Sequence, residues 1–333
     1  MPDSQIEVEN LTKVYHVPER EAGLTASVRS FFRRTYRDVL AVKGISFSIE
    51  AGEIVGFIGA NGAGKTTTLK MLTGLLQPSS GSATIAGFTP WERQPAYLRR
   101  ISMVMGNKSQ MLWDIPPLDT FRVLGAIYGL SSVEAARTVN ELVELLQMQN
   151  LLTKPVRNMS LGERMKCELT AALIHRPEVL FLDEPTIGLD VSAQRRLRQF
   201  IVDYNRQSGV TVMLTSHYMA DVMELCNRVI LIQQGKLIYD GDLAALSQQL
   251  APFKLVRLTL NIDDPVRALR ACLPPDAEIL AGMNGDITLR LDRTKTAHII
   301  AHLLNSLPVD DLSIENPPIE AVIDQIYQGE EVL

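Results

Sequence analysis

The feature that most constrains the fold is an apolar run, a glycine-rich loop and a helical pattern that follow one another from Val55 to Leu72. Ile54 to Ile58 is short, apolar and β-branched, as buried strands are, and Thr66 to Leu76 has helical length and leucine spacing. The loop between them fits G-x-x-x-x-G-K-[ST], in which backbone N–H groups surround phosphate oxygens, the lysine reaches the β and γ phosphates and the hydroxyl binds Mg²⁺. The stretch predicts nucleoside triphosphate binding at a helix N-terminus.

A second run delivers two carboxylates. Val179 to Leu182 is apolar and is closed by Asp183 and Glu184, so it predicts a buried strand with both acids at its carboxyl end, where open α/β sheets bind ligands. Mg²⁺ held by Asp183, with Glu184 turned toward an attacking water, would explain carboxylates so close to a core. His217 follows another predicted strand. It is either a structural histidine or a member of the site at the sheet edge that also holds the phosphate-binding loop.

Small residues from Ser160 to Glu163 precede a helix that we expect to begin near Arg164. A loop of this kind at a helix N-terminus suits an anion. We expect a helical insertion over about 108–176, between two strands of the core.

Composition narrows the class of protein. A chain of 333 residues that is 46% hydrophobic is expected to form two soluble domains, and its net charge of −5 gives no overall basic field for nucleic acid. Three scattered cysteines without C-x-x-C spacing favour a reducing compartment and simple core packing. No window approaches about 18 uninterrupted apolar residues, so any membrane role would act through a partner.

The N-terminal part contains a strand followed by an insertion. Ile6 and Val8 alternate with polar neighbours, and Tyr15 follows where the chain would leave that strand, as either an adenine-stacking ring or an ordinary surface tyrosine. Residues 16–38 interrupt the strands, and strand-like alternation resumes at about Val39. The insertion predicts a basic amphipathic helix whose apolar face holds Leu24, Val28, Phe31, Phe32 and Tyr36 beside a stripe of Arg29, Arg33 and Arg37. Residues 24–37 either contact a membrane surface or partner, or pack on the protein's own sheet.

The C-terminal part has a different pattern. Alternation over Val256–Ile262 and Ile287–Leu291, helices over Pro265–Cys272 and near Thr294–Leu304, and a strand over Val309–Ile314 predict a small βαββαβ α+β domain. A last amphipathic helix is expected after Asn316 and Pro317, running through Tyr327. His298 and His302 have the i, i+4 spacing of a metal pair, but without a third ligand we read them as solvated.

The order of these elements resembles an ATP-binding cassette, the nucleotide-binding subunit of an ABC transporter, over roughly residues 4–240. The resemblance implies an α/β P-loop domain with a mixed sheet and a helical subdomain over 1–245, followed by the accessory α+β domain over 251–333. It makes Tyr15 the adenine-stacking aromatic, Asp183 the Mg²⁺ ligand beside Thr66, Glu184 the catalytic base and His217 the switch histidine that contacts the γ-phosphate. The phosphate-binding loop then comprises Gly59, Asn61, Gly62, Ala63, Gly64, Lys65, Thr66 and Thr67.

The resemblance also implies a composite site between two subunits. Met159 to Glu163 matches the family's signature LSGGQ, in which Ser160, Gly162 and Glu163 would contact ATP held by a second copy or a homologous cassette, and Asp190 would lie in the D-loop at that seam. Leu161 and Glu163 depart from the family's glycine and glutamine, and Glu163 adds a negative charge. The glutamine that usually touches Mg²⁺ or the water is replaced by Asn107, with Gln110 three residues on; either could serve.

The implied function is Mg-ATP hydrolysis that drives export through a separately encoded membrane permease, by a cytoplasmic protein held on the inner face of the cell membrane. Trp113, Ile115 and Pro116 would then be either candidate permease contacts or residues that pack within their own loop. One alternative is a non-transport cassette acting on ribosomes or DNA, although the chain has a single copy of each motif and no sustained heptads. A small-molecule kinase explains the P-loop but not the other motifs.

Overall fold

The computed structural model describes residues 4–18, 36–106, 108–216, 218–250, 253–262, 264–275, 277–283, 286–317 and 323. The chain separates into two compact units, Met1–Leu243 and Ala244–Leu333. No described helix combines the length and the apolarity that crossing a membrane requires.

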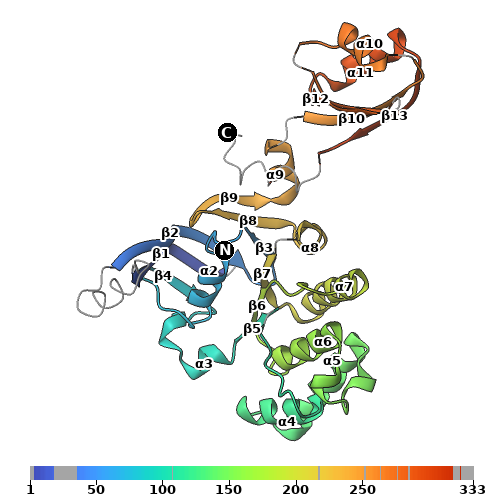
Figure 1. Cartoon of the computed structure of the whole chain (residues 1–333). Coiled ribbons are helices and arrows are strands. Elements are labelled where there is room, and N and C mark those ends of the chain that lie inside the picture. Colours follow the sequence, from blue (N-terminus) through green and yellow to red (C-terminus); the bar gives the residue numbers. More distant parts are fainter. Residues whose placement is uncertain are drawn as a thin grey trace, which may run out of the picture. The chain divides into compact units, whose positions relative to one another are not determined.

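A six-stranded sheet forms the centre of the first unit (Figure 1). Its order is β5 (Ile101–Met105), β6 (Val179–Asp183), β7 (Thr211–Ser216), β3 (Ile54–Ile58), β8 (Arg228–Gln233) and β9 (Lys236–Asp242). The first five strands are parallel and β9 runs antiparallel to β8. Parallel strands are covered on both faces, which explains the continuous apolar runs in β3 and β6. Because β3, β6 and β7 are parallel, their carboxyl ends meet at one edge.

The helix after β3 begins where the sequence predicts and ends earlier. α2 spans Lys65–Leu72 rather than continuing to Leu76. Gly74 has φ +71°, and the N–H of Leu76 donates to the Lys70 carbonyl. A glycine in the left-handed conformation commonly ends a helix in this way. Gly74 therefore ends α2, although the leucine spacing continues to Leu76.

A three-stranded antiparallel sheet of order β2-β1-β4 packs against the first, with β1 over Ser4–Pro18, β2 over Tyr36–Glu50 and β4 over Ser80–Ile85. The predicted strand end was wrong, because Tyr15 lies inside β1, opposite Val39. Tyr36 and Arg37, expected on a helix, belong to β2 and pair with Pro18 and Val17. The ladder with β1 overrides the helical spacing there, while the rest of the predicted insertion helix lies outside the described residues.

A short 3₁₀ turn, η1 (Pro90–Glu92), and the helix α3 (Pro95–Leu98) lead from β4 to β5. The core between the two sheets is apolar. The buried side chains come from both sheets, from α2 and from α3, and include Ile6, Val8, Leu11, Ile45, Phe47, Phe57, Leu69, Ile85 and Tyr97.

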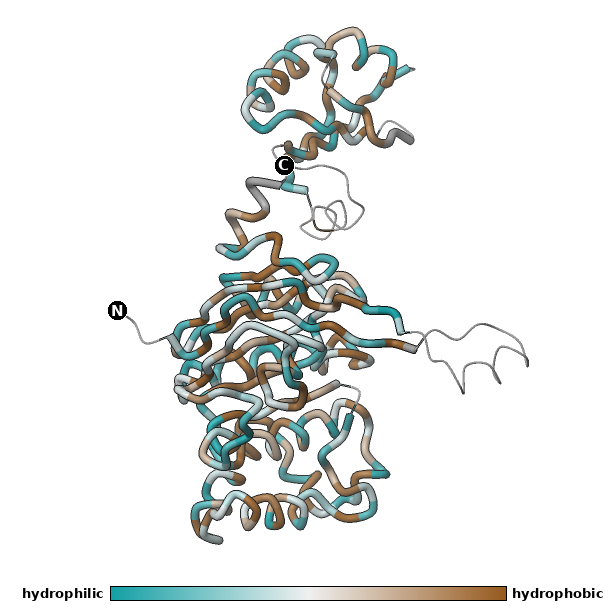
Figure 2. Tube along the Cα trace, turned by 90° about the vertical axis from the view of Figure 1, so that its left-hand side faces the viewer, coloured by the Kyte–Doolittle hydropathy of each residue, from teal (hydrophilic) through white to brown (hydrophobic). Residues whose placement is uncertain are grey.

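The predicted helical insertion between core strands is confirmed. It contains α4 (Pro117–Ile127), α5 (Ser132–Leu146) and α6 (Leu161–Leu173), with the 3₁₀ turns η2 (Gln149–Leu151) and η3 (Val156–Asn158) between the last two. Figure 2 shows apolar residues in brown recurring among polar residues along these helices, as amphipathic helices require. Two further helices, α7 (Val191–Ser208) and α8 (Met219–Leu225), lie to the right of the six-stranded sheet in Figure 1, and α8 packs against α7, β3 and β7.

The second unit has the predicted βαββαβ order. It contains β10 (Phe253–Leu260), α10 (Pro265–Cys272), β11 (Glu278–Met283), β12 (Asp286–Asp292), α11 (Thr296–Ser306) and β13 (Val309–Glu315), after α9 (Leu243–Leu250). The antiparallel sheet has the order β11-β12-β10-β13, and its core holds Val256, Leu258, Leu260, Leu269, Ile287, Leu289, Leu291, Ile300 and Leu303. His298 and His302 are exposed on α11, and the described residues contain no cluster that could hold a metal. Apart from Ile323, the predicted last helix lies outside the described residues.

Candidate functional site

The loop between β3 and α2 holds a buried lysine. Lys65 is 6% exposed, and its Nζ donates to the carbonyl oxygens of Gly59 at 2.6 Å and Ala60 at 3.2 Å. Burial lowers the pKa of Lys65, while the nearby carboxylates of Glu184 and Asp183 act in the opposite direction. The loop therefore places a buried cation close to two carboxylates.

Two glycines of this loop are needed for close backbone contacts. A Cβ on Gly59 would lie 2.4 Å from the Ile232 carbonyl oxygen, and one on Gly64, whose φ is +112°, would lie 2.7 Å from the Ala41 oxygen. Only glycine meets these conditions without moving backbone, so the loop keeps its N–H groups at the start of α2.

The ends of three strands bring a hydroxyl and two carboxylates together. Thr66 Oγ1 donates to Asp183 Oδ1 at 3.3 Å, and Thr215 Oγ1 donates to the same oxygen at 2.7 Å. Glu184 follows directly, and its N–H donates to the carbonyl oxygen of Thr215 at 3.1 Å. Its backbone is left-handed, with φ +52°. Non-glycine residues in this conformation are strained and occur preferentially at functional sites.

A cavity of about 150 Å³ lies against these groups and is lined by Thr66, Lys70, Met105, Lys108, Asp183, Glu184 and Ile187. Hydroxyl and carboxylate oxygens are the hard donors that Mg²⁺ prefers. Thr66 and Asp183 together fit such an ion, and the adjacent Lys65 fits phosphate oxygens. Thr215 was not predicted; its only signal was its place in the sequence LTSHY at the end of a strand.

The segment after β5 arranges the predicted polar residues differently. Asn107 lies outside the described residues. Gln110 does not line the cavity: its side-chain amide donates to the Met103 carbonyl oxygen at 3.0 Å. Lys108 reaches the cavity instead. Of the two alternatives, Gln110 has its amide bonded back to β5 in this structure, and the role of Asn107 stays a prediction.

The segment Met159–Glu163 is the start of a helix rather than a loop. α6 begins at Leu161, not near Arg164, and Ser160 is its N-cap. Ser160 Oγ accepts from the Glu163 N–H at 3.2 Å, and Glu163 Oε2 accepts from the Ser160 N–H at 2.8 Å. This capping box explains the early start and gives Glu163 a local role. An ion pair with Lys154 at 2.8 Å, together with the Ser160 N–H bond, lowers the pKa of Glu163.

The start of α7 lies against the start of α6. Asp190 caps α7 by accepting from the Ala193 N–H at 2.8 Å. A Cβ on Gly188, whose φ is +73°, would lie 2.9 Å from Leu161 Cδ2, and one on Gly162 would lie 3.3 Å from Ala193 Cβ. The structure therefore brings Ser160, Gly162 and Asp190 together at the two helix N-termini.

A buried charge network includes Ser216, at the end of β7; His217, the next residue in the sequence, lies outside the described residues. Asp221 is fully buried and accepts hydrogen bonds from Thr186 at 2.5 Å and Ser216 at 2.9 Å. Arg198 pairs with it at 2.8 Å. Sequence reasoning missed this network, although an arginine beside Leu197 and Ile201, on the buried face of α7, was a possible signal.

Tyr15 is half-buried, with the Lys13 ammonium 5.5 Å from its ring centroid. Its contact with adenine stays a prediction.

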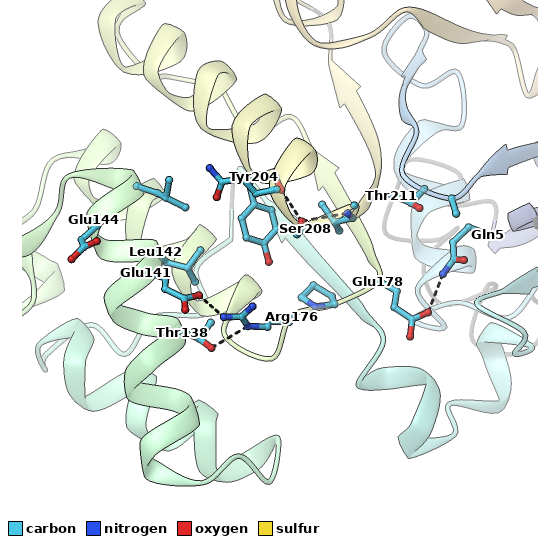
Figure 3. A pocket seen from close by; sticks show the side chains of 16 residues that line it. Gln5, Thr138, Glu141, Leu142, Glu144, Arg176, Glu178, Tyr204, Ser208 and Thr211 are labelled. Carbon is cyan, nitrogen blue, oxygen red and sulfur yellow. Dashed lines mark hydrogen bonds and ion pairs between the residues drawn. The ribbon is translucent and has the colours of Figure 1, made fainter.

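A further cavity, of about 960 Å³, is at the amino ends of β6 and β7, away from these residues (Figure 3). Arg176 lies in it, paired with Glu141 and donating to Thr138 Oγ1 at 3.3 Å, while Gln5 donates to Glu178 at 3.1 Å. None of the predicted site residues lines it.

Comparisons with known proteins agree with this geometry. The family model described as ABC transporter matches residues 42–187. The ABC transporter ATP-binding protein NatA of Bacillus subtilis is 35% identical over 65% of this chain and 87% of its own length. The Nod factor export ATP-binding protein I of Cupriavidus pinatubonensis is 33% identical over 74% of each chain. A solved ATP-binding subunit of an ABC transporter covers 74% of this chain and 93% of its own, with a TM-score of 0.60 and 24% identity.

Proposed function

Because the chain belongs to the family of ABC transporter ATP-binding proteins, we propose that it hydrolyses Mg-ATP to drive export through a separately encoded membrane permease. The observation that carries the proposal is the convergence of Thr66, Asp183 and Glu184 on one cavity beside the buried Lys65. Similarity to a linearmycin resistance ATP-binding protein and to Nod factor export proteins supports export as the direction. The permease would hold the protein at the inner face of the cell membrane.

The residues have separable roles in hydrolysis. Lys65 and the loop N–H groups neutralise the phosphates, and the N-terminus of α2 adds its positive dipole end. Mg²⁺, held by Thr66 and Asp183, would supply further charge neutralisation on the phosphates. Thr215 fixes the Asp183 carboxylate from the other side. Glu184 takes a proton from the attacking water, so that catalysis consists of positioning, charge stabilisation and one proton transfer.

A second copy, or a homologous cassette, would complete the site. Ser160 and Gly162 lie together with Asp190 at two helix N-termini, which attract phosphate. Glu163 is engaged with Lys154 and the Ser160 N–H, so its negative charge is compensated within the chain. That compensation supports a functional site despite the departure from glutamine.

The test is the light-scattering mass of Glu184→Gln with and without Mg-ATP. Trapped ATP should join two copies and double the mass, because ATP then binds the dimer better than the monomer. The matched control adds Lys65→Ala to Glu184→Gln and should remain monomeric. A mass that stays monomeric with saturating ATP, in a protein shown to bind it, would contradict the composite site. Phosphate release by the wild type tests hydrolysis itself, and its absence would contradict the enzymatic role.

A further inference from the structure

A buried carboxylate on α6 holds the segment that follows β5. Glu168 is 4% exposed. Its oxygens accept from the Ser109 hydroxyl, from the Gln110 N–H at 2.9 Å and from the Met111 N–H at 3.3 Å. Among the residues that the structure describes, no cation pairs with Glu168. Its charge is therefore balanced by the hydroxyl and amide groups of one short segment, residues 109–111.

This arrangement makes segment 109–111 dependent on α6. A buried carboxylate that loses its hydrogen bonds costs a large desolvation free energy. Successive N–H groups that converge on an anion also define the conformation of the segment that carries them. The conformation of residues 109–111 therefore depends on the Glu168 carboxylate.

The other end of the same connection is fixed to β6. The Gly106 N–H donates to the Asp183 carbonyl oxygen at 2.9 Å. A Cβ on Gly106 would lie 2.2 Å from the Glu184 carbonyl oxygen, so the two backbones are in direct contact. Lys108 stands between the two fixed ends and lines the cavity with Thr66, Asp183 and Glu184.

α6 also carries the capping box of Ser160 and Glu163, about two helical turns before Glu168. Ser160 and Glu168 are therefore connected by one continuous helix, and Glu168 connects that helix to the segment beside Lys108.

We propose that Glu168 is a positioning residue for ATP hydrolysis, which holds residues 109–111 so that Lys108 stays at the nucleotide cavity. The proposal rests on the proposed function, since it concerns the same site. Glu168 acts through the segment and does not itself line the cavity. Misplacement of a positioned group lowers kcat steeply, whereas ground-state binding of ATP through Lys65 and the P-loop should change little.

The first test is Glu168→Gln in the full-length chain. The amide keeps the shape but replaces an acceptor by an N–H that faces donors. We expect kcat to fall by about tenfold or more while the KM for ATP changes by less than about threefold. Amide hydrogen exchange should become faster in residues 108–113 and stay unchanged in β3 and α2. The matched control is Glu178→Gln. Glu178 is a partly exposed glutamate that precedes β6, at the end of the strand opposite Asp183, and its variant should keep wild-type turnover.

The second variant, Ser109→Ala, removes one donor and leaves both N–H bonds, so it should fold normally and lose less turnover than Glu168→Gln. Combining the two should cost no more than Glu168→Gln alone, because both act through one contact. Turnover of Glu168→Gln within twofold of wild type, or unchanged exchange in 108–113, would overturn the inference. A wild type without ATP turnover would instead sink the proposed function, and the exchange measurement would then decide the role of Glu168 alone.

Discussion

The hydroxyl of Thr66 meets the carboxylate of Asp183 across 117 residues of sequence, with Thr66 Oγ1 3.3 Å from Asp183 Oδ1. Thr66 opens the helix after β3 and Asp183 ends β6, and β7 lies between those strands. Thr215 of β7 donates to the same Asp183 oxygen. The strand order β6-β7-β3 therefore brings Thr66 and Asp183 together.

Thr66→Ala should raise the Mg²⁺ concentration needed for ATP turnover, because it removes one of the two oxygens that fit the ion. We expect kcat/KM at low Mg²⁺ to fall by on the order of tenfold to a hundredfold, the loss typical of an altered metal environment. A titration of phosphate release with Mg²⁺ measures this. Thr12→Ala, in β1, is the control. An unchanged Mg²⁺ titration would remove Thr66 from the ion's coordination.

Glu184→Gln should separate turnover from binding. The loss of the general base should reduce kcat by about a hundredfold to ten-thousandfold, while ATP still binds through Lys65 and the loop. Lys65→Ala should weaken both, since it removes the buried cation. Binding of a fluorescent ATP analogue and phosphate release give the two quantities. Retained turnover in Glu184→Gln would show that another group activates the water.

ATP affinity should fall at a lower alkaline pH than the pKa of an exposed lysine would lead us to expect. Burial is the largest effect on Lys65 and lowers its pKa, and only the charged form attracts phosphate. As pH rises through this lowered pKa, Lys65 of the free protein loses its proton and ATP affinity falls. The fall should therefore occur at a pH below about 10.4, the pKa of an exposed lysine. Dissociation constants measured between about pH 7 and pH 10.4 test this. Lys65→Arg, which keeps its charge, should not show the drop.

Asp221→Ala should destabilise the first unit by about 3 kcal/mol, because it leaves the buried Arg198 paired only with Glu224, a half-exposed residue, and removes the acceptor of Thr186 and Ser216. Urea unfolding followed by tryptophan fluorescence measures the change. Asp119→Ala breaks the exposed pair with Arg122 and should cost less than about 1 kcal/mol. Equal losses in the two variants would show that burial of the Arg198 pair contributes nothing.

Local patterns predicted much of the fold, because they depend on neighbouring residues. The run from Ile54 to Ile58 matches β3, and the alternation of Val256 with Leu258 and Leu260 marks the buried face of β10. The acids Asp183 and Glu184 stand at the strand end that their sequence predicts. In each case one short segment contains all the information that decides its structure.

Features that depend on a distant partner were missed. Tyr36 and Arg37 join β2 because β1 extends to Pro18 opposite them. The spacing of apolar residues within 24–37 contains no information about that pairing. Glu168 looks like any charged residue of an amphipathic helix. Its burial follows only from the donors of residues 109–111, 57 to 59 residues away. The Arg198–Asp221 pair was missed for the same reason.

The left-handed backbone of Glu184 has a consequence for protein engineering. A side chain in this conformation costs about 1 kcal/mol or more, which glycine or asparagine would largely relieve. Directed evolution for heat tolerance alone would therefore enrich Glu184→Gly and Glu184→Asn early. Both remove the carboxylate that we propose as the general base, so such a library should yield more stable proteins that bind ATP but hydrolyse it slowly.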